Sequence, residues 1–237
     1  MLNNNRTRLA NICMLQFIAE KLGELRDQLV FLGGCTTAIF IDELSAPDVR
    51  YTLDVDCIVD VVSLNQYHKI EKQLRNLGFT QSVTEEVICR WRYDNVILDV
   101  MPTDEKILGF GNRWYREAIK YPMNYSLIDK ISIKVISAPY FLATKIEAFK
   151  TRGNTDFYAS HDFEDIVTVL DGRSSIIDEI KKTNSTLRHY LAKEFDGFMK
   201  HPSFSGALPG HFIQYGKLAE DRMEFCAQKL KSIISNA

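Results

Sequence analysis

Apolar residues near the N-terminus recur at spacings of three and four, starting from Leu9. This period places them along one side of a helix, so the pattern predicts an amphipathic helix over residues 8–29. A short apolar run at residues 30–32 then predicts a strand that leads into two consecutive glycines. A second helix is predicted directly after the glycines, over residues 36–44.

The next part of the chain changes to the shorter apolar runs that are typical of strands. Strands are predicted over residues 52–61, 84–92, 96–101 and 132–136. A tight turn at residues 93–95 would join the second and third of these as a pair. Between the first two strands, helical spacing returns over residues 63–77, with Ser63 as the N-cap and Gly78 at the end.

From residue 139 onward the pattern is helical almost throughout. Helices are predicted over residues 139–150, 161–170, 174–182, 186–198 and 218–234. Strands mixed with helices, followed by helices alone, indicate an α+β fold (α/β in its first part) with a catalytic lobe and a helical lobe. We therefore expect an α/β domain at residues 1–138 and a helical domain at residues 139–237.

The composition is that of an ordinary globular protein, with 46% hydrophobic and 25% charged residues among 237. The net charge of −2 excludes an overall basic field that would attract nucleic acid or a membrane surface. The five cysteines are scattered without a C-x-x-C pair, which argues against a disulfide framework and for a reducing compartment. With neither a signal-peptide pattern nor an apolar run of membrane-spanning length, we expect a cytoplasmic protein without a membrane partner.

Two aspartates, Asp54 and Asp56, stand one residue apart inside the first strand predicted after the glycines. Alternate residues of a strand project from the same face, so the two carboxylates would stand side by side, while Leu53, Val55 and Cys57 face the core. Neighbouring carboxylates repel each other, and a divalent cation that prefers oxygen ligands, such as Mg²⁺, is the usual compensation. The alternative is a pair of exposed strand residues without a ligand.

A third carboxylate, Asp99, interrupts the apolar strand predicted at residues 96–101. A carboxylate in such a strand needs a partner or a metal, so a structural, hydrogen-bonded aspartate is the alternative to a metal ligand. If this strand lies beside the strand of Asp54 and Asp56, three carboxylates could hold one or two Mg²⁺ ions, bind a triphosphate and activate an attacking hydroxyl.

The glycine pair Gly33-Gly34 lies between a predicted strand and a predicted helix. Backbone N–H groups in such a turn, together with the N-terminus of the following helix, can bind an anion such as a phosphate. A simple tight turn is the alternative interpretation. A phosphate site beside a metal site would point to nucleotide chemistry.

The predicted helical domain also offers candidate residues. Lys145 lies in an apolar-rich helix, either as a cation that faces phosphates or as a lysine whose stem carries its charge to the surface. Asp162 and Asp165 are three residues apart and share one face of the next helix. Alternatively, Asp162 acts as a favourable charge at the N-terminus of that helix.

These residues occur in an order that resembles the nucleotidyltransferase superfamily, and most closely its AbiEii-type members, which are known from abortive-infection toxin–antitoxin systems. The resemblance covers roughly residues 28–170. It rests on Asp99 and on the segments LGGCTTA at residues 32–38, RYTLDVD at 50–56, SAPYFLATKIEAFKTR at 137–152 and HDFEDI at 161–166. Two positions depart from the family pattern: Cys35 stands where serine or threonine is usual, with Thr36 as its substitute, and His161 stands at the family's basic position.

The resemblance implies a mixed-sheet nucleotidyltransferase domain that transfers a nucleoside monophosphate from an NTP to an acceptor hydroxyl with Mg²⁺. The implied catalytic residues are Asp54, Asp56, Asp99, Lys145 and Asp162, of which the first three would bind the metal. The implied nucleotide-binding residues are Gly33, Gly34, Thr36, Arg50, Thr52 and Lys145. Lys145 would contact the triphosphate, and Asp162 would support catalysis or hold Lys145 in place, a role that Asp165 could equally fill.

The acceptor stays open among a tRNA end, a protein hydroxyl and a small-molecule alcohol. The resemblance also implies a toxin with a cognate antitoxin as its partner. A non-catalytic nucleotide- or RNA-binding module with the same fold is the alternative function. The intact Asp54/Asp56 pair speaks against that alternative, because a pure binding protein has little reason to keep two repelling carboxylates.

Overall fold

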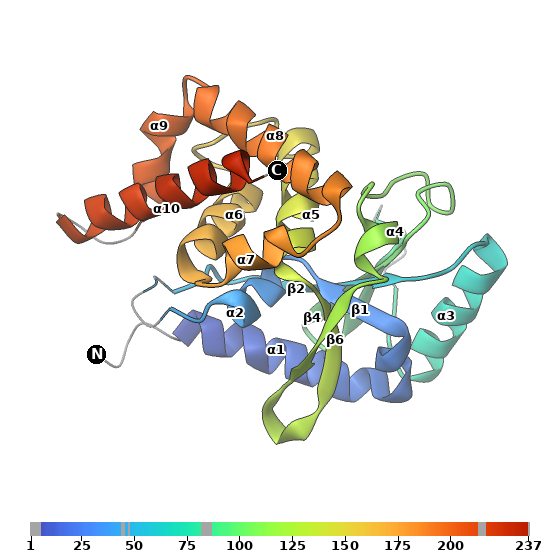
Figure 1. Ribbon diagram of the computed structural model, residues 1–237. Helices are drawn as coiled ribbons and strands as arrows, with labels where there is room; N and C mark the ends of the chain where they lie inside the picture. The colour runs from blue at the N-terminus through green and yellow to red at the C-terminus, as the bar shows by residue number, and fades with distance from the viewer. Residues whose placement is uncertain (1–5, 44–45, 47, 82–86, 213–216, 237) are drawn as a thin grey trace. The chain divides into compact units, whose positions relative to one another are not determined.

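The computed structural model describes residues 6–43, 46, 48–81, 87–212 and 217–236 of the chain. The chain divides into two compact units (Figure 1). The sheet unit consists of Asn5–Ile39 and Arg50–Ser137, and the helical unit contains Phe40–Val49 and Ala138–Ala237. A mixed sheet in one unit and a set of helices in the other confirm the predicted α+β fold class.

The sheet unit is built on a six-stranded mixed sheet with the strand order β3-β4-β2-β1-β6-β5. Its strands are β1 Leu29–Leu32, β2 Asp54–Val59, β3 Arg90–Tyr93, β4 Val96–Pro102, β5 Pro122–Ser126 and β6 Ser132–Ile136. β2 pairs with β4 in parallel, as β1 does with β6, and the other neighbours are antiparallel. The prediction lacked only β5, a short strand at the sheet edge whose residues are half-buried or exposed.

Helices and 3₁₀ turns connect these strands. The helices are α1 Arg6–Leu22, α2 Thr37–Phe40, α3 Leu64–Asn76 and α4 Tyr115–Ala118, and the 3₁₀ turns are Gly23–Gln28, Gly34–Thr36 and Ile128–Lys130. The helix predicted over residues 8–29 is wrong at its end, because Gly23 has a φ of +53° and the chain continues as a 3₁₀ turn. The helix predicted over residues 36–44 is too long, since α2 ends at Phe40, and residue 44 lies outside the described part.

The ends of α3 agree with the prediction. The Ser63 hydroxyl accepts a hydrogen bond from the backbone N–H of Gln66, which is the geometry of an N-cap. Gly78 follows the helix with a φ of +90°, a conformation that glycine adopts without steric cost. The capping signals in the sequence therefore located this helix to within a residue at each end.

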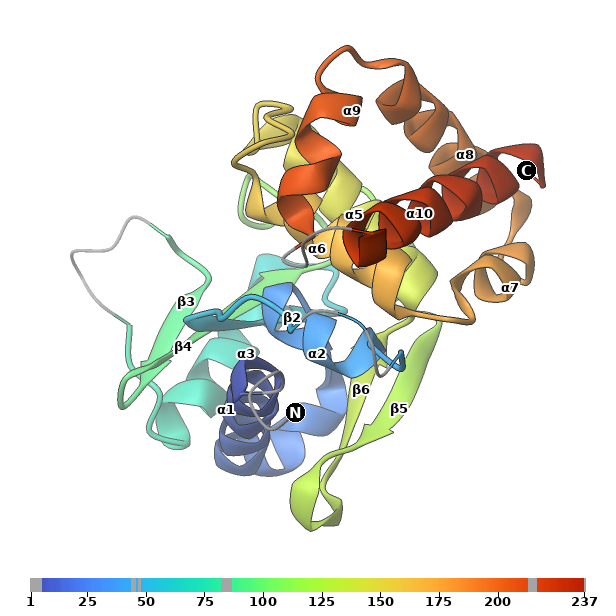
Figure 2. The same cartoon turned by 90° about the vertical axis from the view of Figure 1, so that its left-hand side faces the viewer.

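β3 and β4 form the predicted antiparallel pair (Figure 2), but the turn lies at residues 94–95 rather than 93–95, because residue 93 still belongs to β3. The strand predicted over residues 84–92 begins only at Arg90, and residues 84–86 lie outside the described part. The register of the hairpin sets Arg90 directly opposite Asp99.

The two faces of the central strands differ in burial. Residues of β2 and β4 on the covered face have no exposed surface; they are Val55, Cys57, Leu98 and Val100. The α3 residue Tyr67 donates a hydrogen bond from its hydroxyl to the Val100 carbonyl, so α3 lies on this face. Leu53 was wrongly expected in the same core: it is 67% exposed, because β2 begins one residue later, at Asp54.

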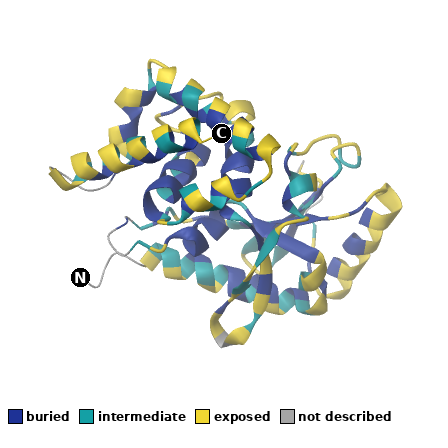
Figure 3. Cartoon of the chain, in the orientation of Figure 1, coloured by how far each residue is buried: buried dark blue, intermediate teal, exposed yellow. Residues whose placement is uncertain are grey.

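The helical unit contains α5 to α10. These helices are α5 Ala138–Thr151, α6 His161–Gly172, α7 Ile176–Lys181, α8 Ser185–Lys200, α9 Phe204–Ala207 and α10 Lys217–Ser235, with a 3₁₀ turn at Leu208–His211. Buried residues run along α5 and α6 (Figure 3), where Phe149 packs against the rings of Phe157, Phe163 and Phe198. No helix in the described ranges combines the length and apolar character that crossing a membrane requires.

A segment from the first half of the sequence, Phe40–Val49, belongs to the helical unit. The backbone N–H groups of Asp42 and Glu43 both donate to the Gly172 carbonyl at the end of α6, at 3.0 and 3.1 Å. The ring of Phe40 packs on Phe141 of α5, with 4.9 Å between centroids. The helical unit is therefore discontinuous in sequence, while the division into domains at residues 1–138 and 139–237 stays a prediction.

Candidate functional site

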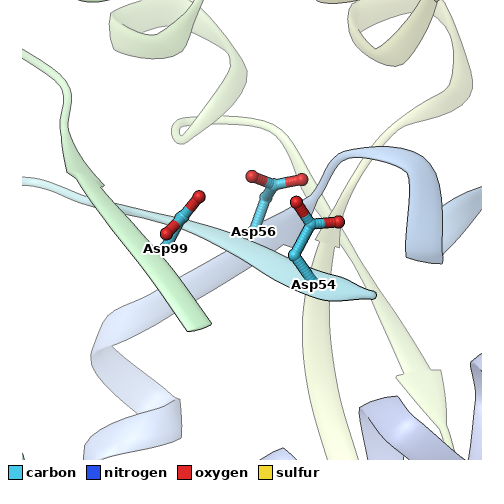
Figure 4. Close-up of side chains that lie close together, drawn as sticks. All are labelled: Asp54, Asp56 and Asp99. Atoms are coloured by element: carbon cyan, nitrogen blue, oxygen red, sulfur yellow. The ribbon is translucent and has the colours of Figure 1, made fainter. Parts of the chain in front are cut away.

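Three carboxylates meet on one face of the sheet unit. Asp54 and Asp56 alternate with the buried residues of β2, and the parallel pairing of β2 with β4 sets Asp56 directly beside Asp99. Paired residues of neighbouring strands point to the same face, so all three side chains turn to one side (Figure 4). One carboxylate oxygen from each residue lies within 4.8 Å of those of the other two. We call these residues the acidic triad.

The acidic triad fits a hard divalent cation. All of its donors are carboxylate oxygens, the ligand type that Mg²⁺ prefers. Asp54 and Asp56 are half-buried, and Asp99 is buried. Three close carboxylates repel one another strongly where the effective dielectric constant is low, so a cation between them would remove an unfavourable term of the fold. The donor set thus agrees with the Mg²⁺ site expected from the sequence, and the assignment of its ligands stays a prediction.

Asp99 also has a protein partner, which the sequence analysis missed. The guanidinium of Arg90 donates from Nε to Asp99 Oδ1 at 2.9 Å and from Nη2 to Oδ2 at 2.7 Å. The two interpretations of Asp99 are therefore not exclusive, because a hydrogen-bonded aspartate also belongs to the acidic triad. The sequence signal was inexact: a turn was predicted at residues 93–95, whereas the turn at residues 94–95 sets the register that pairs Arg90 with Asp99.

Glycine is required at positions 33 and 34 because side chains of site residues lie directly against the backbone there. Gly33 has a φ of +78° and a ψ of −173°, a conformation that is essentially restricted to glycine. A Cβ atom at Gly33 would lie 1.8 Å from Asp56 Oδ2, and one at Gly34 would lie 2.1 Å from Arg50 Nη2. Both side chains therefore pass directly against the glycine backbone. The pair is more than a tight turn, since it makes room for a triad carboxylate and for an arginine.

Thr36 and Cys35 support this turn from inside. The Thr36 hydroxyl donates to the Gly33 carbonyl at 2.8 Å, and the residue is fully buried. Cys35 is also fully buried and donates from Sγ to the Asn11 carbonyl at 3.3 Å. Burial raises the pKa of the Cys35 thiol well above its ordinary value, so it stays a neutral thiol. In this arrangement both side chains face the protein interior.

Asn11 of α1 holds the segment that leads into the acidic triad, a role that the sequence analysis missed. Its Nδ2 donates to the Arg50 carbonyl at 2.9 Å, and its Oδ1 accepts from the Thr52 backbone N–H at 3.4 Å. Asn11 has no exposed surface, although it lies on a helix that is mostly apolar toward the core. A buried polar residue at an apolar position of the helical period was the available signal.

The candidate residues of the helical unit form a buried ion cluster. Lys145 is 4% exposed, so the interpretation of a stem that carries its charge to the surface is wrong. Its ammonium donates to Asp162 Oδ1 at 2.9 Å and lies 2.6 Å from Asp165 Oδ2. Both aspartates of α6 therefore contact Lys145, and neither alone fills the predicted role of holding it.

Arg152 completes this ion cluster from its exposed side. Its Nε and Nη2 donate to the two carboxylate oxygens of Asp162 at 2.8 and 2.9 Å. Burial works to raise the pKa of Asp162, but the hydrogen bonds and charges of Arg152 and Lys145 outweigh it and hold the pKa well below its ordinary value. His161, at the family's basic position, is exposed and pairs with Glu164 instead. The basic partners of Asp162 are thus Lys145 of α5 and Arg152, the residue that follows α5.

The predicted site residues form two groups. The sheet unit brings together the acidic triad and, around the glycine turn, the residues Gly33, Gly34, Thr36, Arg50 and Thr52. The helical unit brings together Lys145 and Asp162, with Asp165 and Arg152. In the helical group the two cations, Lys145 and Arg152, balance the two carboxylates. In the sheet group Arg90 contacts only Asp99, and the three carboxylates outnumber the two arginines.

Comparisons with known proteins were made for the sequence and for the fold. No protein-family model matches the chain, and no curated protein matches it. Among solved structures it is similar to an antigenic nucleotidyltransferase-like protein from Paracoccidioides brasiliensis, with 18% identity, a TM-score of 0.48, and coverage of 83% of this chain and 91% of that one. It is also similar to the antibiotic-resistance factor ANT(2'')-Ia, with 14% identity, a TM-score of 0.48, and coverage of 81% and 97%. Interpretation of the site therefore rests on its own geometry.

Proposed function

We propose that this protein is a nucleotidyltransferase that transfers a nucleoside monophosphate from an NTP to an acceptor hydroxyl with Mg²⁺. The observation that carries the proposal is the convergence of Asp54, Asp56 and Asp99 beside the Gly33-Gly34 turn. Oxygen donors for a hard cation and a close-approaching backbone turn are the two elements that binding of a metal–triphosphate requires.

In this proposal, different residues bind the metal ion and the phosphates. Asp54 and Asp56 would hold Mg²⁺ together with Asp99, and the bound ion would supply charge neutralisation for the phosphates. Backbone N–H groups of the glycine turn would bind the phosphates, and Arg50, which lies against Gly34, would be a cation for them. Catalysis then depends mainly on positioning and electrostatics, with pyrophosphate as the leaving group.

Lys145 and Asp162 enter the proposal through the sequence resemblance. Lys145 is the proposed cation for the triphosphate, and Asp162 is the residue that holds it. What supports the second role is the buried contact of the Lys145 ammonium with Asp162 Oδ1 at 2.9 Å. Asp165 shares this positioning role through its own contact with the same ammonium, at 2.6 Å.

The experiment that tests the proposal measures pyrophosphate release and label transfer from each of the four radiolabelled NTPs to cellular RNA, to protein and to small-molecule alcohols. The variants Asp54→Asn and Asp56→Asn are expected to abolish transfer. Asp60→Asn is the matched control, because Asp60 follows the same strand, is exposed and accepts a hydrogen bond from Thr103 outside the acidic triad. Equal Mg²⁺-dependent NTP binding in wild type and Asp54→Asn would contradict the proposal.

The same experiment distinguishes the proposed transferase from the alternative, a non-catalytic binding module. An NTP that binds with Mg²⁺ but releases no pyrophosphate with any acceptor would identify a non-catalytic nucleotide- or RNA-binding module. The proposal favours turnover, because the protein keeps three mutually repelling carboxylates within 4.8 Å.

The AbiEii-type resemblance extends the proposal to a toxin with a cognate antitoxin. Induced expression of the wild-type chain is then expected to arrest growth, and Asp56→Asn to relieve the arrest at equal protein level. Arrest by both forms would contradict a toxic activity that depends on the acidic triad.

A further inference from the structure

Arg90 is a cation that contacts the acidic triad through Asp99. It stands opposite Asp99 in the β3–β4 hairpin. The neighbouring pair, Cys89 and Val100, is joined by a backbone hydrogen bond, so Arg90 and Asp99 form the non-hydrogen-bonded type of pair, in which side chains lie closest. The result is a two-pronged contact in which both Asp99 oxygens accept from one guanidinium.

This contact competes with a metal for the same carboxylate. Arg90 supplies Asp99 with the positive charge that a divalent cation would otherwise supply, and it occupies both oxygens. A cation approaching Asp54 and Asp56 meets the guanidinium charge close to its third ligand. The Asp99 side chain is only 9% exposed, whereas the Arg90 side chain is 25% exposed. Of the two partners, Arg90 is the more exposed.

We propose that Arg90 is a further substrate-binding residue, which neutralises Asp99 before the metal binds and contacts a phosphate of the nucleotide once the metal has taken Asp99. This inference rests on the proposed function. The planar guanidinium presents paired donors that match phosphate oxygens as well as carboxylate oxygens, so the same side chain suits both partners. Arg90 lies on the strand next to Asp99 and on the face of the acidic triad, where a metal-bound triphosphate would lie.

The test uses Mn²⁺ as the probe and measures binding by calorimetry and by electron paramagnetic resonance, without any turnover. In Arg90→Met, Mn²⁺ alone is expected to bind on the order of tenfold more tightly, because its third ligand is released from a competing charge. A non-hydrolysable nucleoside triphosphate added with saturating Mn²⁺ is expected to bind roughly tenfold more weakly, because a charged phosphate contact is lost. Damage to the fold would weaken the binding of both Mn²⁺ and the triphosphate. Tighter Mn²⁺ binding together with weaker triphosphate binding therefore indicates that Arg90 exchanges Asp99 for a phosphate.

Arg116→Met is the matched control. Arg116 also pairs with an aspartate of the sheet unit, Asp104, at 2.8 Å, but outside the acidic triad. The variant changes the net charge by the same amount as Arg90→Met, and both affinities are expected to stay at the wild-type values. A second variant, Arg90→Lys, keeps the charge without the two-pronged fork; it is expected to bind Mn²⁺ as wild type does and the triphosphate more weakly.

Weaker or unchanged Mn²⁺ binding in Arg90→Met would overturn the inference and make Arg90 a residue that only orients Asp99. Wild-type binding of the triphosphate by Arg90→Lys and Arg90→Met would also overturn it. Failure of the proposed function looks different: wild type and Asp54→Asn would then bind Mn²⁺ equally, whatever stands at position 90.

Discussion

At the scale of single residues, the two glycines of the turn leave space that the side chains of Asp56 and Arg50 fill. Asp56 Oδ2 occupies the space into which a Cβ at Gly33 would project, and Arg50 does the same at Gly34. The chain thereby brings a carboxylate and a guanidinium into contact with the backbone of one turn. Under the proposed function, a metal-bound phosphate would meet backbone, carboxylate and cation together at this turn.

Gly33→Ala is expected to lower Mn²⁺ affinity on the order of tenfold, because the new Cβ displaces the Asp56 carboxylate from the acidic triad. The strained backbone conformation also costs about 1–3 kcal/mol of unfolding free energy. Calorimetric titration with Mn²⁺ and urea unfolding measure the two effects separately.

Gly23→Ala is the control for this prediction. Gly23 also has a positive φ, of +53°, but a Cβ there would meet no atom within 4 Å. It is expected to lose stability through backbone strain while keeping the wild-type Mn²⁺ affinity. Equal losses of affinity in both variants would mean that Gly33 acts through general destabilisation, and the prediction would be wrong.

The side-by-side position of Asp54 and Asp56 follows from the strand period alone, because alternation is a local property. The addition of Asp99 needed the pairing of β2 with β4, which the sequence pattern left conditional. The partners of Asn11 lay beyond prediction, because they are the backbone groups of residues 50 and 52, which become neighbours only in the folded chain.

At the scale of secondary structure elements, α5 and α6 are joined by the buried contacts of Lys145. Lys145→Met is expected to destabilise the protein by about 3–5 kcal/mol, because it leaves Asp162 and Asp165 buried without this cation. Lys150→Met on the same helix is the control: its pair with Glu194 is partly exposed, so the expected loss is at most about 1 kcal/mol. Urea unfolding of both variants measures the difference; similar losses would show that the buried cluster contributes no more than a surface pair.

The depressed pKa of Asp162 predicts a pH dependence of stability. The charged form is favoured in the folded protein, so this group stabilises the fold above its ordinary value of 3.8, and the contribution is lost as the pH falls below that value. Arg152→Gln removes the largest favourable hydrogen-bonding partner and is expected to cost about 1 kcal/mol near pH 7, because the arginine is mostly exposed.

The difference between wild type and Arg152→Gln is therefore expected to shrink as the pH falls below about 4. Urea unfolding at a series of pH values measures it. A difference that is constant down to the lowest pH at which the protein folds would mean that Arg152 stabilises through packing rather than through the charge of Asp162.

The helices of this unit were predictable because their signals are local. Ser160 caps α6 by accepting from the Phe163 N–H, and the Asp162/Asp165 spacing already placed both carboxylates on one face. The contact of Arg152 with Asp162 was less accessible, because Arg152 lies just after α5, ten residues earlier, and its side chain turns back to α6. The family position next to Asp162 pointed instead to His161, which is exposed.

At the scale of the whole molecule, the part of the chain that the structure describes enters the helical unit twice. Segment 40–49 has too few residues to form a core of its own, and its composition does not mark it as part of another unit. Its assignment depends on tertiary contacts, such as those of Asp42 and Glu43 with the Gly172 carbonyl. Sequence pattern located the change from mixed to purely helical structure near residue 138, but no periodicity could reveal this second, earlier crossing.

Substitutions at Gly172 and Gly197 test how much the packing of segment 40–49 contributes to the stability of the helical unit. Both lie in helices, where replacing glycine by alanine ordinarily stabilises by up to about 1 kcal/mol. At Gly197 a Cβ would meet no atom within 4 Å, whereas at Gly172 it would lie 2.8 Å from Ile41 Cδ1 and 3.3 Å from Ala46 Cβ. Gly197→Ala is therefore expected to raise the unfolding free energy, and Gly172→Ala to lower it by about 1–2 kcal/mol. Backbone hydrogen exchange at residues 41–43 is expected to be faster in Gly172→Ala alone, because the displaced segment loses its hydrogen bonds to α6. Equal stabilisation by both variants would mean that the segment contributes nothing to the stability of the helical unit.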